Sequence, residues 1–550
     1  MAEEDLIFGK NRHFFGGIEP SNMRKFTASY HSGYVKLECQ LPYETTINGQ
    51  TLCSVAGAVI RKKSAGYPTD EFDGELVADI KYSMDIIDRN VSIGNIYYYA
   101  AFPYTGQGVY NRSPSNRTMY NYNSDHYVFG YDLQLDDSNP NTRVSYPPEV
   151  TNYNYTPAKV VNKSGYPFSY GSWPSSYGNN FIPRPCMLNF DGTIRHYLNP
   201  NDYTKQYNSS LSSDVANLEA TANAMMEWPK IYIHREVVNG VYKFRCSDIK
   251  QGLDWDCWCN YDVNNNVIDH FYTGIYPGVY HYDGSVKRLR SISGQTTSDA
   301  SSLYNSYGGS SDLNSFYKIY SKFIRNNNPS GKNIWTAETL SDRMLIQDLL
   351  IMMAKSTDFR WSYGKAINSM SNIATGLSDT EGLFKGALGS GFNGPKVFGM
   401  ENWWGGPARL IDGLIGNNYT MYYKITPGTH DGTATTDFSS STYANTFKSI
   451  AASDKNGFIS GMEFVSPYGR LYPNETNGSS STYETGYALI GFKDSNKSGT
   501  VFFTGNYKYT ENANPFTIVY SGIDTNFGNV SYGVDYDSTC ATLSCRPIKS

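Results

Sequence analysis

Short strand-like runs of mostly hydrophobic residues alternate with clusters of polar turn residues near the start of the chain. Residues 34–39, 56–61 and 96–102 are such runs, and turn residues follow the second of them at 66–68. Short runs of this kind, bounded by turn residues, are typical of β-strands. Strands at this spacing predict a β-sandwich of about 100 residues, which we place within residues 1–122.

The pattern changes over residues 123–180, which carry few aliphatic side chains. This segment is rich in Tyr, Asn and Pro, for example at residues 146–148 and 152–155 and at Trp173-Pro174. We interpret it as a linker or extended arm, which could be ordered by packing on a neighbouring subunit.

Residues 181–550 predict an α+β domain. Residues 213–226 are expected to form a helix that presents Val215, Leu218, Ala222 and Met225 on one face. The strongest helix signal covers residues 337–355, because apolar side chains recur there with helical spacing. Those side chains are Leu345, Leu349, Met352 and Met353, with Thr336 as the expected cap and Glu338 near the start of the helix. The fold class predicted for the whole chain is therefore mainly β with some α.

Composition supports a β-rich protein with long polar loops. The chain of 550 residues has 48 Tyr and 50 Gly but only 18% charged residues, and Tyr and Gly are favoured in strands and turns respectively. Tyr also suits recognition surfaces, because it offers a large rigid contact area at low entropic cost. The net charge of −5 comes without a basic block, so we expect no nucleic-acid partner.

Nothing in the sequence predicts export by a signal peptide or insertion in a membrane. The acidic start of the chain lacks an apolar core, so no secretory signal is expected. The most apolar stretch, residues 344–354, is interrupted by Gln347 and Asp348 and is too short to span a bilayer.

The motifs that usually carry chemistry are missing from the sequence. The eight cysteines are too scattered for a disulfide framework, and the spacing of Cys257 and Cys259 does not suit zinc. Residues 262–266 begin like a calcium loop, but Val267 replaces its glycine and Thr273 its glutamate. There is no phosphate-binding loop and no nucleophile elbow. We therefore expect no metal, no cofactor and no enzymatic activity.

Three groups of segments carry a resemblance to known proteins. The first comprises residues 8–10, 15–22, 60–68, 72–74 and 97–104, and the second comprises residues 185–188, 191–193, 197–203 and 223–230. The third comprises residues 289–294, 341–344, 354–357, 397–405 and 541–547. The first group resembles fibronectin-type-III-like modules of bacteriophage tail proteins, and the second resembles a segment of the same proteins. The third resembles the C-type-lectin-like fold of phage tropism determinants and formylglycine-generating enzymes, from which residues 406–409 depart.

This resemblance implies a protein of the virion tail or fibre, assembled in the cytoplasm of a bacterial host, that binds a receptor on the host surface. It further implies a homotrimer whose N-terminal part contacts other virion proteins. It places the recognition surface at about residues 483–536, where Tyr, Asn and Asp side chains suit a glycan or protein epitope. The residues predicted to bind the ligand are Tyr507, Tyr509, Asn512, Asn514, Tyr520, Asp524, Asn526 and Tyr532.

A second motif is expected to stabilise the fold rather than to bind a ligand. It consists of Glu401, Asn402, Trp403, Trp404 and Gly405, in which the Trp rings would anchor the core and the glycine would allow a tight turn.

Two other functions are compatible with the resemblance. The chain could be a structural virion component, such as a collar, head fibre or baseplate protein, without a receptor of its own. It could also be an enzyme of the formylglycine-generating type, a class that uses a cysteine pair. Cys540 and Cys545 lie near each other in the sequence, but Asp537 is the only acidic neighbour of Cys540, so we do not predict this activity.

Overall fold

The computed structural model confirms that the protein is mainly β, with few helices. It describes residues 18–31, 34–47, 50–91, 95–122, 127–137, 139, 141–161, 167–175, 181–297, 316–364, 373–386, 395–403, 408–417, 420–424, 447–451, 457–464, 471–476, 487–488, 498–504, 518–521 and 539–549. The chain divides into two compact units. Unit 1 contains Met1–Val128 and Ile249–Asp256, and unit 2 contains Phe129–Asp248 and Cys257–Ser550.

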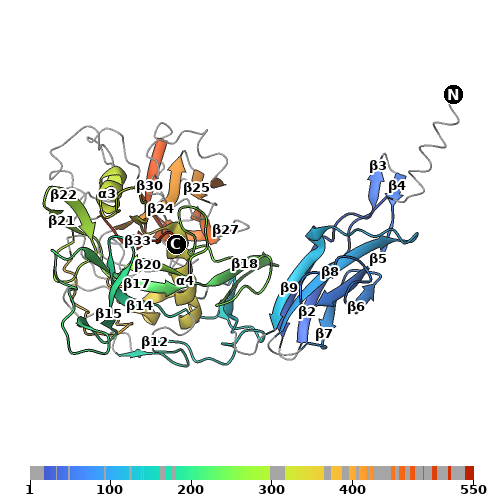
Figure 1. The fold of residues 1–550 in the computed structure, drawn as a ribbon, viewed down its shortest axis with the longest axis horizontal. Coiled ribbons are helices and arrows are strands. Elements are labelled where there is room, and N and C mark those ends of the chain that lie inside the picture. The colour runs from blue at the N-terminus through green and yellow to red at the C-terminus, as the bar shows by residue number, and fades with distance from the viewer. Residues whose placement is uncertain are drawn as a thin grey trace. The chain divides into compact units, whose positions relative to one another are not determined.

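Unit 1 is built on two antiparallel sheets, drawn in blue in Figure 1. Buried side chains of both sheets form one core. The first sheet has the order β1 (Lys25–His31), β2 (Tyr34–Gln40), β7 (Met84–Asp88). The second has the order β6 (Glu75–Ile80), β5 (Val55–Lys63), β8 (Asn95–Thr105), β9 (Arg117–Tyr122). A hairpin of β3 (Thr45–Ile47) and β4 (Gln50–Cys53) and the short helix η1 (Pro114–Asn116) complete the described elements.

The sandwich forms because alternate side chains of both sheets are apolar. Val35 and Leu37 of β2 are fully buried, as are Ala58 and Ile60 of β5 and Tyr99 of β8. Burial of this kind contributes about 25 cal/mol per Å² of apolar surface. The strands predicted at residues 34–39, 56–61 and 96–102 are present as β2, β5 and β8.

The main sheet of unit 2 has seven antiparallel strands. Their order is β16 (Asp202–Gln206), β15 (Ile194–Asn199), β14 (Arg184–Asn189), β17 (Ala222–Pro229), β20 (His270–Gly274), β33 (Leu543–Cys545), β23 (Trp335–Ala337). A separate hairpin joins β21 (Val279–Asp283) to β22 (Val286–Arg290). The last strand of the chain thus lies between two strands that come more than 200 residues earlier.

The central helix α4 (Leu340–Ala354) confirms the stronger helix prediction. All of its residues except Ser341 are buried, which is typical of a helix that crosses a core. Its cap is Thr339 rather than the expected Thr336, which lies in β23. Thr339 and Asp342 form a reciprocal capping box, and the helix ends at Lys355 in the left-handed conformation. The other described helices are α3 (Phe316–Arg325) and α5 (Phe359–Ser362).

The helix predicted over residues 213–226 is wrong. Residues 222–229 form the strand β17, which pairs with β14 on one side and β20 on the other. Every residue of β17 except Pro229 is buried. A strand buried on both faces is apolar at nearly every position, so apolar residues at helical spacing occur in it by coincidence.

The predicted linker is also wrong for the parts of residues 123–180 that the structure describes. This stretch contributes β10 (Phe129–Gln134), β11 (Val144–Ser145), β12 (Lys159–Val160) and β13 (Phe168–Ser169). Strands β11 and β10 continue into the hairpin of β19 (Val241–Ser247) and β18 (Tyr232–Val238). Aromatic side chains of the stretch, including Phe129 and Trp173, belong to the hydrophobic core of unit 2. Sparse aliphatic residues suggested a linker, but the aromatic residues supply the apolar surface instead.

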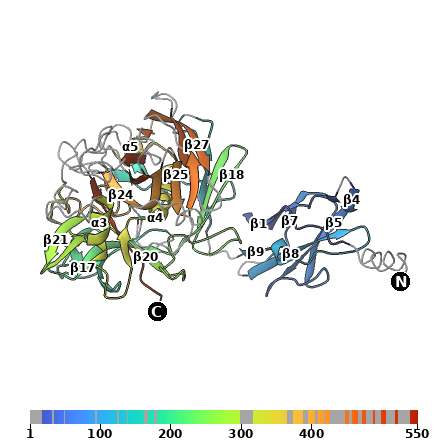
Figure 2. The ribbon, with the colours of Figure 1, turned by 90° about the horizontal axis from the view of Figure 1, so that it is seen from above.

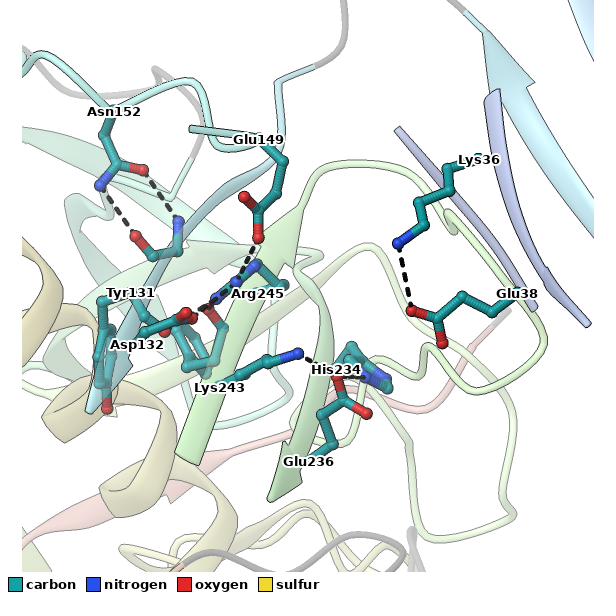
Figure 3. A network of polar contacts seen from close by, with 12 residues as sticks. Lys36, Glu38, Tyr131, Asp132, Glu149, Asn152, His234, Glu236, Lys243 and Arg245 are labelled. Atoms are coloured by element: carbon teal, nitrogen blue, oxygen red, sulfur yellow. Dashed lines mark hydrogen bonds and ion pairs between the residues drawn. The ribbon is translucent and has the colours of Figure 1, made fainter. Parts of the chain in front are cut away.

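Polar contacts also hold this stretch against the hairpin of β18 and β19 (Figure 3). The Arg245 Nη2 atom lies 2.7 Å from Asp132 Oδ1 and 2.9 Å from Glu149 Oε1. The Asn152 amide donates to the Gly130 carbonyl and accepts from its N–H, both at 2.9 Å. The Asn152 contacts satisfy the backbone N–H and carbonyl of Gly130 in β10. The stretch is therefore an integral part of unit 2.

Candidate functional site

The predicted recognition surface falls largely outside the described residues. Seven of the eight predicted ligand-binding positions lie there, namely Tyr507, Tyr509, Asn512, Asn514, Asp524, Asn526 and Tyr532. Tyr520 lies in β31 (Ile518–Ser521), where its backbone pairs with that of Phe502 in β30 (Ser498–Thr504). Within the predicted surface the structure describes only residues 487–488, 498–504 and 518–521.

Strands β30 and β31 belong to a larger sheet. Its order is β26 (Phe447–Ala451), β25 (Thr420–Lys424), β24 (Ala408–Asn417), β30, β31. Figures 1 and 2 show β24 beside β25 in unit 2, in orange. A second sheet has the order β28 (Leu471–Thr476), β27 (Gly457–Phe464), β29 (Tyr487–Ala488). Both sheets belong to one continuous stretch of chain between β24 and β32 (Thr539–Ala541).

This stretch, residues 413–538, is joined to the core at its two ends by neighbouring strands, β24 and β32. Strands β24 and β32 are parallel, and Arg409 is the partner of Cys540. Leu410, Ile411, Cys540 and Ala541 are all at most 1% exposed. Both ends of the stretch are therefore fixed side by side in the buried base. We call residues 413–538 the displayed segment.

Arg409 clamps the two ends of the displayed segment to the motif at residues 401–405. Its Nη1 atom donates to Thr542 Oγ1 at 3.1 Å, just after β32. Its Nη2 atom donates to the carbonyls of Glu401, at 3.1 Å, and of Asn402. Arg409 is 2% exposed, and hydrogen bonds from a charged donor are the stronger kind. Arg409 is not among the site residues predicted from the sequence, where it belongs only to residues 406–409, which depart from the resemblance. A lone arginine directly before the apolar pair Leu410-Ile411 is the signal that could have drawn attention to it.

The described part of the motif is buried and makes internal contacts. The Glu401 carboxylate accepts three hydrogen bonds of 2.8 Å, from the backbone N–H groups of Gly376 and Ser378 and from the Ser378 hydroxyl. The Arg343 guanidinium lies 3.8 Å from the centre of the Trp403 ring and donates to the Trp403 carbonyl at 3.4 Å. Trp404 and Gly405 lie outside the described residues.

Lys396 and Asp379 extend the polar cluster around Glu401. The Lys396 Nζ atom donates to the Ser378 carbonyl at 2.7 Å and lies 3.9 Å from the centre of the Tyr203 ring. Burial lowers the pKa of Lys396 to about 8 and raises the pKa of Glu401 and of Asp379. The Asp379 carboxylate accepts from the hydroxyls of Tyr276 and Ser293. Each of these three groups therefore has hydrogen-bond partners inside the core, as a stable buried polar cluster requires.

The C-terminal strand is held by a buried ion pair. Arg546 and Asp342 are 2% and 0% exposed and contact each other through Nη2 and Oδ1. Arg546 also donates to the Cys259 carbonyl at 3.0 Å, and the Ser544 hydroxyl donates to Asp342 Oδ2 at 2.9 Å. The capping residues of α4, the strand β33 and the loop at Cys259 thus meet at one buried point.

The loop at residues 262–266, which begins like a calcium loop, is held by hydrogen bonds to the Asp262 carboxylate. The Asp262 carboxylate accepts from the backbone N–H groups of Asn264, Asn266 and Lys549, at 2.8 to 3.1 Å. These bonds lower the pKa of Asp262 against the opposing effect of its burial. Across the described part of the chain, no group of three or more His, Cys, Asp or Glu side chains could hold a metal ion.

All eight cysteines are buried as free thiols. Burial raises the pKa of Cys540 to about 11 and that of Cys39 to about 12. We therefore expect the native protein to react slowly with a thiol reagent at pH 8, because the thiolate is the reacting species. All eight thiols should react once the protein is unfolded in guanidinium. The measurement is the absorbance of the released reagent, calibrated with free cysteine. Rapid reaction of Cys540 or Cys545 in the native protein would contradict this expectation. It would favour the hypothesis of an enzyme of the formylglycine-generating type.

Comparisons with known proteins assign no family to this chain. No protein-family model matches it, and no curated protein matches it. Among the described residues, no helix is both long enough and apolar enough to cross a membrane.

Proposed function

We propose that this chain is a bacteriophage tail or fibre protein that binds a receptor, a glycan or a protein, on the bacterial cell surface. The observation that carries the proposal is how the two ends of the displayed segment are anchored. Its two ends lie in adjacent parallel strands over a buried base, and Arg409 clamps both of them. Recognition proteins commonly carry their binding residues on segments that a rigid scaffold positions.

The composition of the displayed segment supports the same function. It is rich in Tyr, Asn, Ser, Thr and Gly and contains the eight predicted ligand-binding positions. Rigid aromatic rings combined with adaptable polar side chains are typical of surfaces that recognise epitopes. In this proposal unit 2 is a C-type-lectin-like head.

Unit 1 suits a spacer or docking module. Its sheets of three and four strands have an architecture that fibronectin type III modules share. We propose that it contacts other tail proteins, and that the assembled protein is a homotrimer located in the virion.

The test is binding of the purified full chain to intact cells from a panel of bacterial species and to glycans extracted from their cell walls. We expect saturable binding to at least one species. Tyr507→Ala and Tyr520→Ala should each weaken it by about tenfold, as expected for aromatic residues at the centre of an interface.

The control is Tyr153→Ala, because Tyr153 is 48% exposed in unit 2 but lies outside the displayed segment. Binding by this variant should equal that of the unmodified protein. Absence of saturable binding to every species would overturn the receptor-binding proposal and favour a structural virion component.

A further inference from the structure

A lysine occupies a core position of the sandwich in unit 1. Lys62 is on β5, two and four residues after the buried Ile60 and Ala58, so its side chain points to the same face as theirs. Its cross-strand neighbours are Glu75 on β6 and Tyr99 on β8. A carboxylate, an amine and a phenol thus form one row across three adjacent strands.

The opposite sheet supplies a second carboxylate to the same place. Asp88 is on β7, two residues after the buried Ile86, and is 5% exposed, while Lys62 is 3% exposed. The Lys62 Nζ atom lies 2.9 Å and 3.0 Å from the two oxygens of Asp88. It also lies 3.6 Å from Glu75 Oε1. The amine therefore contacts one carboxylate across the core and another within its own sheet.

Neighbouring groups hold both carboxylates in place. The Tyr99 hydroxyl donates to Asp88 Oδ2 at 2.9 Å, and the backbone N–H of Asn90 donates to Asp88 Oδ1 at 3.0 Å. The Asn90 amide donates to Glu75 Oε1 at 2.6 Å. Burial, followed by the charge of Asp88, raises the pKa of Tyr99, so this phenol remains a donor at neutral pH.

Stability alone gives little reason for an ion pair at this position. Removing two charges from water costs several kcal/mol per ion, and apolar residues of similar volume often replace buried pairs without loss. A lysine and an aspartate in van der Waals reach, with a second carboxylate to move protons, are however the groups needed to form an amide.

We propose that Lys62 and Asp88 form an intramolecular isopeptide bond, with Glu75 as the group that transfers the protons. This inference is independent of the receptor-binding function proposed above. It assigns to unit 1 a covalent cross-link between its two sheets.

The reaction is balanced without a co-reactant. Glu75 accepts a proton from the Lys62 ammonium, and the freed electron pair of Nζ attacks Cγ of Asp88. The hydrogen bond from Tyr99 stabilises the negative charge that develops on Oδ2. The bond from Cγ to the other oxygen, Oδ1, then breaks, and this oxygen leaves as water with the proton from Glu75 and a second proton from Nζ. An ammonium and a carboxylate thus become a neutral amide and one water. Fixed proximity replaces the activation that such a condensation needs in solution.

The cross-link would join strands of opposite sheets that are 26 residues apart in the chain. Pulling or heating could then separate the sheets only by breaking a covalent bond. A loop closed in this way also restricts the unfolded chain, as a disulfide does.

The test is the intact mass of the purified full chain, measured after denaturation in guanidinium. We expect a mass lower by one water than the mass of the same chain without the bond. A proteolytic digest should contain a branched peptide that joins the residues around Lys62 to those around Asp88. Lys62→Arg removes the nucleophile, so the mass difference between this variant and the unmodified protein should exceed that of the substitution by one water.

Lys63→Arg is the matched control, because it makes the same change of mass at the next residue, which pairs with Asp73. It should keep the missing water. Glu75→Gln, at a side chain that is 50% exposed, should fold but form the bond much more slowly or not at all. A mass that shows no missing water and a digest without the branched peptide, in the unmodified protein, would overturn the proposal and leave Lys62 and Asp88 as a buried ion pair only.

Discussion

Arg546→Ala is expected to destabilise unit 2 by about 3–5 kcal/mol, the usual cost of removing one partner of a buried ion pair. The substitution leaves Asp342, which is 0% exposed, as a buried charge without its guanidinium partner. It also removes the hydrogen bonds to the Cys259 carbonyl and to the Ser544 hydroxyl. The strand β33 would then lose its main polar attachment to the start of α4.

The free energy of unfolding can be followed by tryptophan fluorescence in a denaturant titration. Every tryptophan except Trp255 lies in unit 2, so the signal reports this unit. The control is Lys230→Ala, which breaks a pair with Asp269 that is 29% and 78% exposed and should cost less than about 1 kcal/mol. Equal effects of the two substitutions would show that the ion pair of Arg546 does not stabilise the base.

Asp348→Ala is expected to cost a similar amount, about 3–5 kcal/mol. Asp348 of α4 is 0% exposed and lies 2.8 Å from Arg235 Nη2 on β18. It also accepts from the Tyr131 hydroxyl on β10 at 2.8 Å. One carboxylate therefore connects the central helix to two strands of the neighbouring sheet, and its loss leaves the Arg235 charge buried without a counter-ion.

Tyr131→Phe separates the two contributions, because it removes one hydrogen bond while Asp348 keeps Arg235. We expect this variant to cost about 1–3 kcal/mol, the range for one buried acceptor that loses its donor. Both variants are measured by the same fluorescence titration. If residues 129–134 acted only as a linker, Tyr131→Phe would leave the unfolding free energy unchanged.

Local pattern was enough to predict several elements of the fold. Strand-like runs between turn clusters predicted β2, β5 and β8, and the repeated apolar positions of residues 345–353 predicted α4. These predictions succeeded because the apolar residues of each element's own sequence form the face that the element buries. The cap of α4 was misplaced by three residues, because Thr336 and Thr339 are equally good caps and only the strand β23 decides between them.

Local pattern failed where burial on both faces or pairing with distant strands decides the structure. The apolar residues around Met225 suit a helix and a central strand equally, and the pairing of β17 with β14 and β20 selects the strand. The sequence around Phe129 and Trp173 predicted a linker because it has few aliphatic residues. In the folded chain these aromatic residues pack in the core of unit 2, and β10 pairs with β19.

The amino-acid sequence alone predicts that the protein is mainly β, that its core contains one strongly apolar helix, and that a Tyr- and Asn-rich segment lies near its C-terminus. These properties follow from composition and from short-range periodicity. Two sets of contacts arise only when the chain is folded. Both ends of the displayed segment meet at Arg409, and Lys62 of unit 1 contacts Asp88 and Glu75. Such contacts join strands that are distant in the sequence, and charged residues in a strand give no local sign of the partners that burial brings to them.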